Sequence, residues 1–541
     1  MKEIEEEYRL KDWLRYLEYL DTGPHSIQIT TSNMAPQKPL LHQEHTAILE
    51  LDYSLWPFQK KILYEMGNVD LILGLPTGLG KTYLAGARLQ MESAKTPIRV
   101  LFLVPSIPLG IQQTLFAREK LGSHAVFVSG GIPPKMRETL KVWNNAFVVT
   151  TPQTFYNDHL VAYERYLKQA RTVENPISYL QQVIPRFPFD IVVADECQRY
   201  IGMTAGYSIL LSARACRAKI LALSATPQLH ASHRLKELRK VFHTIKTFSV
   251  SDPGITKHLP ERLLVIEQLQ PPTSLLKVYH ALGKLVSLYH FRIAKIYGSK
   301  HPRICSRHAL CRALLAIRML QLRVVEDGAS SVKDYETWKF RDLQNRRNNL
   351  DGNSVWNLYQ IALQECNNHK LQAALHILRR ERYHKAIVYV ESVEPAKQLT
   401  TTLQAHNGVE TAACLVGKGD MTMDQQASAL LQFKEIAKTL VCTSVGEEGL
   451  DIPSADLEIW IDPPSNPRKW IQRFGRILRQ PGDKHLAKTI ALINHNTHEH
   501  TRLLNVKKTV EHTYGFTQNV KTQVFQSISQ SQRTITQYLR P

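Results

Sequence analysis

One glycine-rich stretch decides the fold: Leu75-Pro76-Thr77-Gly78-Leu79-Gly80-Lys81-Thr82. It follows the apolar run LILGL (71–75) and precedes the helical segment TYLAGARLQM. A strand, a glycine loop and a helix N-terminus form a cradle for phosphate, because backbone N–H groups and the helix dipole face the anion. We therefore predict a nucleotide site in which Lys81 reaches the β- and γ-phosphates and Thr82 holds Mg²⁺. The residues expected to contact the nucleotide here are Pro76, Thr77, Gly78, Leu79, Gly80, Lys81 and Thr82.

This loop departs from the usual pattern at one position. Leu75 stands where the first glycine of such loops is usual. The alternative to a phosphate loop is a chance glycine-rich turn, and the flanking strand and helix patterns argue against that alternative.

The loop belongs to a series of short apolar runs separated by helical segments. Strands that read as continuous apolar runs, spaced by helices, indicate a parallel sheet covered on both faces. The series stops near Gln270, and the segment from Pro272 to Leu378 has the three- and four-residue spacing of helices. It then resumes. The runs are 71–75, 100–104, 147–149, 191–194 and 220–223, followed by 386–390, 439–443, 457–461 and 489–493.

The pattern predicts an α/β fold in which two parallel-sheet domains stand in tandem with an all-α insert between them. The expected boundaries are an N-terminal helix and linker at 1–48, a first, ATP-binding domain at 49–270, a helical insert at 271–378, a second α/β domain at 379–505 and a C-terminal tail at 506–541.

Composition narrows the class of protein. The 541 residues carry 68 Lys plus Arg against 48 Asp plus Glu, a formal charge of +20. Such a field attracts polyanions, although an ordinary basic enzyme is the alternative. The N-terminal MKEIEEEYRL lacks the apolar core of a secretory signal, and seven scattered cysteines suit a reducing compartment. We expect a soluble intracellular protein with no membrane contact, cytoplasmic or, in a eukaryote, nuclear, with a monomer favoured.

An acidic pair follows a second apolar run. Asp195 and Glu196 come directly after IVVA (191–194). Asp195 is expected to hold Mg²⁺ through water, and Glu196 to orient and deprotonate the water that attacks the γ-phosphate. The alternative, an acidic helix cap, is weakened because a phosphate loop precedes the pair.

Three further motifs settle the family. They are LSATP at 223–227, GEEGLDIP at 446–453 and QRFGRILR at 472–479. Together with the two motifs above, and in this order, they resemble superfamily-2 helicases over about residues 50–500. The resemblance implies two RecA-like domains, ATP as the nucleotide and Mg²⁺ as its metal.

The resemblance also assigns roles. It implies that Gln59 reads adenine, that Arg476 and Arg479 reach the γ-phosphate as arginine fingers, and that Gln472 faces the nucleotide. Charge on the transferred phosphoryl group is then stabilised only when both domains close on it. A solvated basic helix face that also includes Arg473 is the alternative. Further implied positions are Gly449 and Asp451 at the nucleotide, and Ser224 and Thr226, which couple domain motion to nucleic acid.

Nucleic acid is expected to lie across both domains. Small hydroxyl residues and backbone N–H groups suit phosphate contacts, which position a strand without reading its sequence. Ordinary capping and turn residues are the alternative. The positions that match the family's strand-contacting motifs are Pro105, Ser106, Thr151, Pro152 and Gln153 in the first domain, and Thr443, Ser444 and Gly446 in the second.

The wording of the motifs, with a helical insert between the motor domains, most resembles the archaeal Hef and Fanconi-anaemia M translocase branch. That branch implies a DNA helicase or translocase acting on forked or branched DNA in replication or repair. Two alternatives stay open: a motor directed by double-stranded RNA, as in the Dicer and RNA-sensor cousins, and a nucleic-acid-binding scaffold that closes on ATP without turnover. The sequence departs from the family at Gln198, where a histidine is common.

Two remaining signals concern partners and zinc. Near the C-terminus, Gln532, Ile535, Tyr538 and Leu539 resemble the sliding-clamp peptide box, in which one helical turn plugs an apolar pocket. An unstructured tail is the alternative. A second group has short spacings that suggest zinc, but core cysteines in a predicted helix are favoured. Its members are His301, Cys305, His308 and Cys311, with Cys366 and His369.

Overall fold

The computed structural model forms two compact units, which meet between Gly254 and Ile255 in the chain. It describes residues 55–67, 70–76, 78–202, 204–225, 237, 239–242, 244–249, 252–256, 259–297, 309–326, 358, 361–362, 368–405, 412–417, 419–447, 452, 455–477, 486–514 and 520–526. The expected N-terminal helix and linker lie outside these residues.

The first unit is built on a parallel sheet with the strand order β3-β4-β2-β5-β6-β1-β7. The five apolar runs expected in this domain all form strands of this sheet. Two strands at its edges, β3 and β7, were not marked by apolar runs, because their side chains are partly exposed. The strands are β1 (Leu71–Gly74), β2 (Val100–Leu103), β3 (Val126–Val128), β4 (Phe147–Thr150), β5 (Ile191–Ala194), β6 (Lys219–Ser224) and β7 (Thr244–Thr247).

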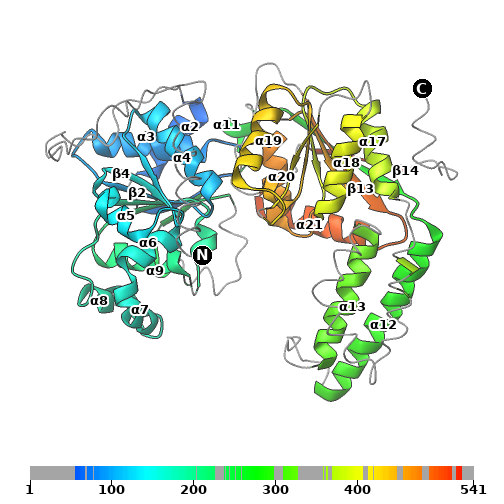
Figure 1. Cartoon of the computed structure of the whole chain (residues 1–541), viewed down its shortest axis with the longest axis horizontal. Helices are drawn as coiled ribbons and strands as arrows, with labels where there is room; N and C mark the ends of the chain where they lie inside the picture. The colour runs from blue at the N-terminus through cyan, green and yellow to red at the C-terminus, as the bar shows by residue number, and fades with distance from the viewer. Residues whose placement is uncertain are drawn as a thin grey trace. The chain divides into compact units, whose positions relative to one another are not determined.

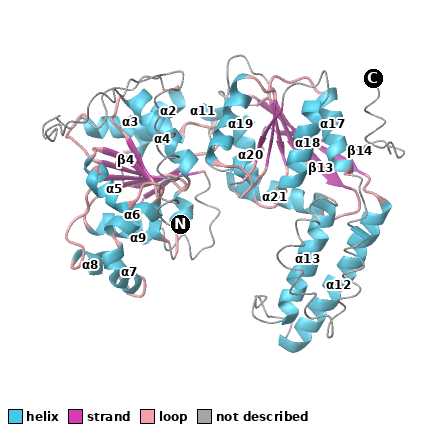
Figure 2. Cartoon of the chain, viewed as in Figure 1, coloured by secondary structure: helices cyan, strands magenta, loops and turns pink. Residues whose placement is uncertain are grey.

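Helices lie on both sides of this sheet (Figure 2). Alternate strand residues enter the same core, as the pleat requires: Val192 and Ala194 of β5 pack with Ile220 and Ala222 of β6. The helices are α2 (Pro57–Met66), α3 (Lys81–Ser93), α4 (Ile107–Leu121), α5 (Pro134–Thr139), α6 (Pro152–His159), α7 (Glu164–Ala170), α8 (Pro176–Gln181), α9 (Ala205–Ala215) and α11 (Pro253–Thr256), with short 3-10 turns at Val142–Asn144, Val161–Tyr163 and Cys197–Tyr200.

The second unit repeats the architecture, with the strand order β10-β11-β9-β12-β13-β8-β14 in a parallel sheet. All four apolar runs expected in the second domain are strands of it. The strands are β8 (Glu261–Leu269), β9 (Ala386–Tyr389), β10 (Ala412–Leu415), β11 (Thr439–Cys442), β12 (Leu457–Trp460), β13 (Leu486–Asn494) and β14 (Val520–Gln526).

Two domain boundaries differ from those expected at 270 and 505. β8 pairs along its whole length with β13, and β14 pairs with β8, so both strands belong to the second sheet. The segment 261–269 is therefore part of the second unit, and the segment expected to be a tail supplies the sheet's edge strand. Neither segment was among the apolar runs expected to form strands, and the local sequence of a segment does not show which sheet it joins.

The helices of the second unit again cover its sheet. α17 packs Leu371, Ala374 and Ile377 into the core of this sheet, so the helical insert ends before His369 and not at 378. The helices are α17 (His369–Arg380), α18 (Val393–Ala405), α19 (Met423–Glu435), α20 (Pro467–Ile477) and α21 (Glu499–Tyr514), with a 3-10 turn at Ser444–Glu447.

The predicted insert contains two long helices, α12 (Thr273–Tyr297) and α13 (Ala309–Glu326), which lie side by side with their own apolar core (Figure 1). The start of α12 and the end of α13 contact the second α/β domain. The Tyr279 ring stacks on His498 at 5.6 Å, and the Asn494 side chain donates to the Val325 oxygen at 2.7 Å.

The two parallel sheets and the helical pair between them confirm the fold class predicted from the sequence. Within the described residues, no helix is both long and apolar enough to cross a membrane.

Candidate nucleotide and nucleic-acid site

The phosphate loop connects β1 to α3 and has the backbone that its glycines allow. Gly78 and Gly80 have φ angles of 88° and 83°, in the left-handed region that favours glycine. Gly80 is the N-cap of α3, so Lys81 and Thr82 begin the helix at the end where the backbone N–H groups point outward. The Lys81 ammonium donates to the Leu75 carbonyl oxygen at 3.1 Å and stays at the loop.

The departure at Leu75 has a structural reason. Its side chain is fully buried, and its backbone N–H donates to the Ser224 carbonyl oxygen at 3.0 Å. Leu75 therefore extends the pairing of β1 with β6 and fills the core, and the turn begins only after it.

Gln59 on α2 lies against this loop. Its amide nitrogen donates to the Leu79 oxygen at 3.2 Å, and its amide oxygen accepts from the Trp56 N–H at 2.9 Å. A Cβ atom at Gly80 would lie 2.4 Å from the Gln59 amide nitrogen, so any other residue there would displace the Gln59 amide, at a φ of +83° that itself favours glycine. Pro76 and Leu79 are buried in the same loop, while Thr77 lies outside the described residues.

The acidic pair stands at the end of β5, beside the loop. Asp195 is buried, and burial first, then the charge of Glu196, raises its pKa to about 7, while Lys81 opposes the shift. The Thr82 hydroxyl and the Asp195 carboxylate are linked through one side chain: the Gln113 amide nitrogen lies 3.3 Å from Thr82 Oγ1 and 3.4 Å from Asp195 Oδ2. These oxygen donors fit a hard cation such as Mg²⁺.

A chain of hydrogen bonds leads from the acidic pair to the third motif. Gln198 donates to the Glu196 carboxylate and accepts from Ser224 Oγ at 2.7 Å. Glu196 itself has a φ of 50°, which turns its side chain out of the strand direction. Gln198 thus occupies the place of the usual histidine and makes contacts on both sides. Thr226 lies outside the described residues.

The arginine-rich motif forms α20 in the second unit. Gln472, Arg473 and Arg476 are 4%, 0% and 3% exposed, so the alternative of a solvated basic helix face is wrong for them. Arg473 donates to the Asp462 oxygen at 2.5 Å and lies over the Tyr389 ring at 4.8 Å. Arg473 therefore anchors the helix. Arg479, Gly449 and Asp451 lie outside the described residues.

The residues proposed to contact nucleic acid lie at the carboxyl ends of strands, where ligands bind in open α/β sheets. Ser106 and Thr151 are N-caps of α4 and α6, and neither hydroxyl makes a capping hydrogen bond. The alternative of ordinary capping residues is therefore not supported for these two. Pro105 follows β2, Pro152 begins α6, and exposed Gln153 donates to Asn157 at 2.7 Å.

In the second unit, Thr443 and Ser444 follow β11 in the same way. The Gly446 N–H donates to the Thr443 oxygen at 2.9 Å, and a Cβ atom at Gly446 would lie 2.5 Å from the Cys442 sulfur. A side chain at position 446 would therefore displace the buried Cys442 side chain.

The zinc and clamp signals fall mostly outside the described residues. This holds for His301, Cys305, His308 and Cys366, and for Gln532, Ile535, Tyr538 and Leu539. Cys311 lies on α13 and is buried. His369 Nε2 is hydrogen-bonded to Asn494 Oδ1 at 2.5 Å. In the part of the chain that the structure describes, no group of three or more His, Cys, Asp or Glu could hold a metal ion.

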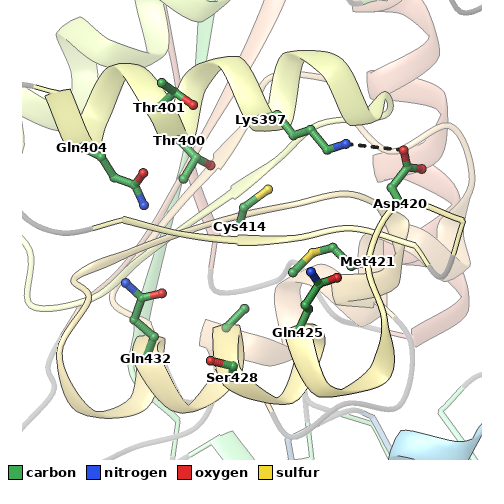
Figure 3. Close-up of a pocket in the computed structure, with 11 residues that line it drawn as sticks. Lys397, Thr400, Thr401, Gln404, Cys414, Asp420, Met421, Gln425, Ser428 and Gln432 are labelled. Atoms are coloured by element: carbon green, nitrogen blue, oxygen red, sulfur yellow. Dashed lines mark hydrogen bonds and ion pairs between the residues drawn. The ribbon is translucent and has the colours of Figure 1, made fainter.

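A cavity of about 420 Å³ lies elsewhere, over the edge strand β10 between α18 and α19 (Figure 3). Its lining is polar, with Gln404, Gln425 and Gln432 from the two helices and a 3.5 Å ion pair between Lys397 and Asp420. Gln404 donates to the Ala412 oxygen at 2.8 Å, and this contact satisfies part of the open strand edge.

Sequence reasoning missed Gln113, the residue that joins the two expected Mg²⁺ ligands. A glutamine among the polar positions of a helix carries no signal of its own, because such residues are common on helix surfaces. Only the register of α4 against β5 and α3 brings it to the site.

Two protein families match the chain, one in each unit. The family described as DEAD/DEAH box helicase matches residues 56–235, and the helicase conserved C-terminal domain matches residues 369–480. The matches cover the phosphate loop and acidic pair in one case, and α20 in the other.

Helicases are also among the relatives that match most of the chain. The chain is 23% identical to the ATP-dependent DNA helicase MPH1 of Pyricularia oryzae over 86% of its length and 47% of that protein. It is 25% identical to the DEAD-box ATP-dependent DNA helicase Fancm of Drosophila melanogaster over 81% of its length and 33% of that protein. The chain therefore spans half or less of these relatives.

Among solved structures, the helicase domain of Pyrococcus furiosus Hef matches 83% of this chain and 98% of its own, with a TM-score of 0.51 and 20% identity. This likeness shows the fold, two RecA-like parallel-sheet domains in tandem.

Proposed function

Since this chain belongs to superfamily 2 of the helicases and stands near the Hef and Fanconi-anaemia M branch, we propose that it is an ATP-driven motor that translocates on DNA and remodels forked or branched DNA. The observation that carries the proposal is the convergence of Lys81, Thr82, Asp195 and Glu196 at the carboxyl ends of β1 and β5. A protein that only bound nucleic acid would not need a complete hydrolytic set.

In the first unit, each side chain has a chemical task. The N-terminus of α3 binds the phosphates through backbone N–H groups, and Lys81 neutralises charge on the β- and γ-phosphates. Thr82 and Asp195 would hold Mg²⁺, which would offset the negative charge of the phosphates. Glu196 orients the attacking water and accepts its proton.

In the second unit, α20 would supply the remaining positive charge. Arg476 and Gln472 are the described members of this set, and Arg479 is the third. Buried Arg473 fixes the helix that carries them. Hydrolysis that needs both units would then be coupled to their closure, and alternate closing and opening would move the strand.

The insert is proposed to grip duplex DNA. α12 carries Lys277, Lys284, Arg292 and Lys295 and has no acidic residue in its sequence. Basic side chains on one element neutralise backbone phosphates without reading sequence. Exposed Phe291 and Ile296, at 68% and 56%, add apolar surface to the same helix.

A comparison of nucleic acids tests the proposal. Steady-state ATPase is measured with single-stranded DNA, duplex DNA, forked DNA and duplex RNA. Forked DNA is expected to stimulate most. Glu196→Gln should reduce the stimulated rate at least ~100-fold, while Glu119→Gln, an exposed position on α4, should not. Stronger stimulation by duplex RNA would favour the RNA-directed alternative, and an absence of turnover with every nucleic acid would favour the scaffold.

A sliding clamp is proposed as a partner for the C-terminal peptide. Ile535, Tyr538 and Leu539 would fill one apolar pocket as a single helical turn. Replacing all three by alanine should abolish clamp pull-down and leave the ATPase intact. Unchanged pull-down would remove this partner from the proposal.

A further inference from the structure

Gln113 lies where three elements of the nucleotide site meet. It stands on α4 and is 2% exposed, and its amide nitrogen contacts Thr82 Oγ1 at 3.3 Å and Asp195 Oδ2 at 3.4 Å. Thr82 lies in the first turn of α3 and Asp195 directly follows β5, so these two oxygens come from segments far apart in the chain. The glutamine is the described side chain that touches both.

We propose that Gln113 is a positioning residue that holds the Thr82 hydroxyl and the Asp195 carboxylate in the arrangement that receives Mg²⁺. The inference rests on the ATP site proposed above and names a residue that acts through two expected ligands.

The donor chemistry supports this role. The amide nitrogen has two hydrogens, which match two oxygen acceptors, and each contact restricts the rotation of one ligand group. Mg²⁺ demands near-ideal octahedral geometry, so a ligand turned away from its position costs affinity. Groups that orient metal ligands commonly change metal affinity when they are removed.

The other end of the amide is compatible with the same role. Gln113 Oε1 is buried and has no hydrogen-bond partner among the described residues. Buried amide oxygens are normally paired, and an unpaired one needs an explanation. Mg²⁺ keeps several of its waters when it binds protein, and such a water is a donor that Gln113 Oε1 can accept from.

A purely structural role makes a different prediction. If Gln113 only filled space under α4, an apolar side chain of similar size would preserve the site. Gln112 offers the matched control, because it is the neighbouring glutamine on the same helix and its Oε1 is likewise buried without a partner among the described residues. The hydrogen bonds to Thr82 and Asp195 come from Gln113.

The experiment measures binding of a fluorescent ATP analogue by the full chain while Mg²⁺ is titrated, and again in EDTA. Gln113→Leu should raise the Mg²⁺ concentration for half-maximal binding about five- to tenfold, the effect of one or two lost hydrogen bonds. Its affinity in EDTA should stay that of the wild type. Gln112→Leu should titrate like the wild type throughout.

A Gln113→Leu titration that coincides with the wild type would overturn the inference. If that variant does not fold, Gln113→Met keeps the length and approximate volume of the side chain without the amide donor, and its Mg²⁺ titration must also differ from that of the wild type. Wild-type protein that does not bind the analogue at any Mg²⁺ concentration would refute the ATP site itself, and wild-type binding that does not depend on Mg²⁺ would overturn the inference. Mg²⁺-dependent wild-type binding with unchanged Gln113 variants would refute the inference alone.

Discussion

Ser224 Oγ donates a 2.7 Å hydrogen bond to the side-chain oxygen of Gln198. The other end of Gln198 donates to Glu196, the residue proposed to activate water. The third motif of the first unit is therefore joined to the hydrolytic carboxylate by one amide group. Like histidine, glutamine offers a donor and an acceptor in one planar group, and Gln198 uses both.

Breaking this link should uncouple DNA binding from hydrolysis. We expect Ser224→Ala and Gln198→Ala each to lower DNA stimulation of the ATPase about five- to tenfold, the equivalent of one hydrogen bond. Because both act on one link, the double variant should be no worse than either single variant. The measurement is the ratio of ATPase rates with and without forked DNA. Ser212→Ala, at a buried serine on α9, is the control, and additive losses would contradict a shared link.

Whether a strand could be predicted from the sequence depended on how deeply its side chains are buried. β1, β2, β4, β5 and β6 were recognisable because buried parallel strands are continuously apolar. β3 and β7 are partly exposed edge strands and leave no such run. β8 was assigned to the neighbouring domain because the choice of sheet is made by packing that one segment does not display.

The site residues also fall into two groups, those that could be predicted from the sequence and those that could not. Lys81 and Asp195 lie in contiguous motifs, each beside a strand, so their neighbourhood could be predicted from parallel topology alone. Gln113 enters the site through the packing of α4, and the burial of Arg473 depends on Tyr389 and Asp462. Contacts between distant segments have no local sequence signature.

The fit of Gly80 against Gln59 predicts a position-specific effect of alanine. Gly80→Ala would place its Cβ 2.4 Å from the Gln59 amide nitrogen at a φ of +83°. We expect nucleotide affinity to fall at least ~10-fold, because the Gln59 amide, which is expected to read adenine, must leave its place against the loop to relieve the contact. Gly67→Ala is the matched control: its φ is +64°, and nothing lies within 4 Å. It should cost about 1 kcal/mol of stability and leave binding unchanged. Equal effects on binding would contradict the argument.

Replacing the buried Lys370 should cause a large loss of stability in the second unit. Its ammonium lies 2.8 Å from Glu499 and 3.6 Å from Asp462, and all three side chains are at most 1% exposed. Burial raises the pKa of Glu499 although Lys370 opposes it. Lys370→Met would leave two carboxyl groups buried without their cation, at a cost of about 3–5 kcal/mol.

Thermal denaturation measures this loss, and two comparisons identify its cause. Adding Glu499→Gln to Lys370→Met should recover part of the stability, because one of the uncompensated charges is removed. Lys397→Met breaks a 3.5 Å pair with Asp420 in which both side chains are more than 40% exposed. It should cost less than about 1 kcal/mol. Similar losses from Lys370→Met and Lys397→Met would refute the prediction.

The lowered pKa values of two histidines lead us to expect that the second unit loses stability in acid. Burial lowers the pKa of His369 to about 4, and the pKa of His498 also falls to about 4 through burial first and then Arg502 and Arg318. In the unfolded chain both titrate near ~6.5, so between these values the unfolded state binds more protons. Stability from these groups is therefore complete above about pH 6.5 and is lost as the pH falls toward about 4.

Hydrogen exchange of the β13 amides reports this unit separately from the first. We expect the free energy of opening to fall by about 1–2 kcal/mol for each histidine between pH 7 and pH 4.5, once the intrinsic exchange rate is corrected for pH. His369→Gln removes one titrating group, so the decline should be correspondingly smaller. His376→Gln, at an exposed position on the same helix α17, should leave the decline unchanged. If His369→Gln and the wild type lost protection in parallel, the acid sensitivity would have to come from other groups, because this substitution removes the titrating imidazole of His369.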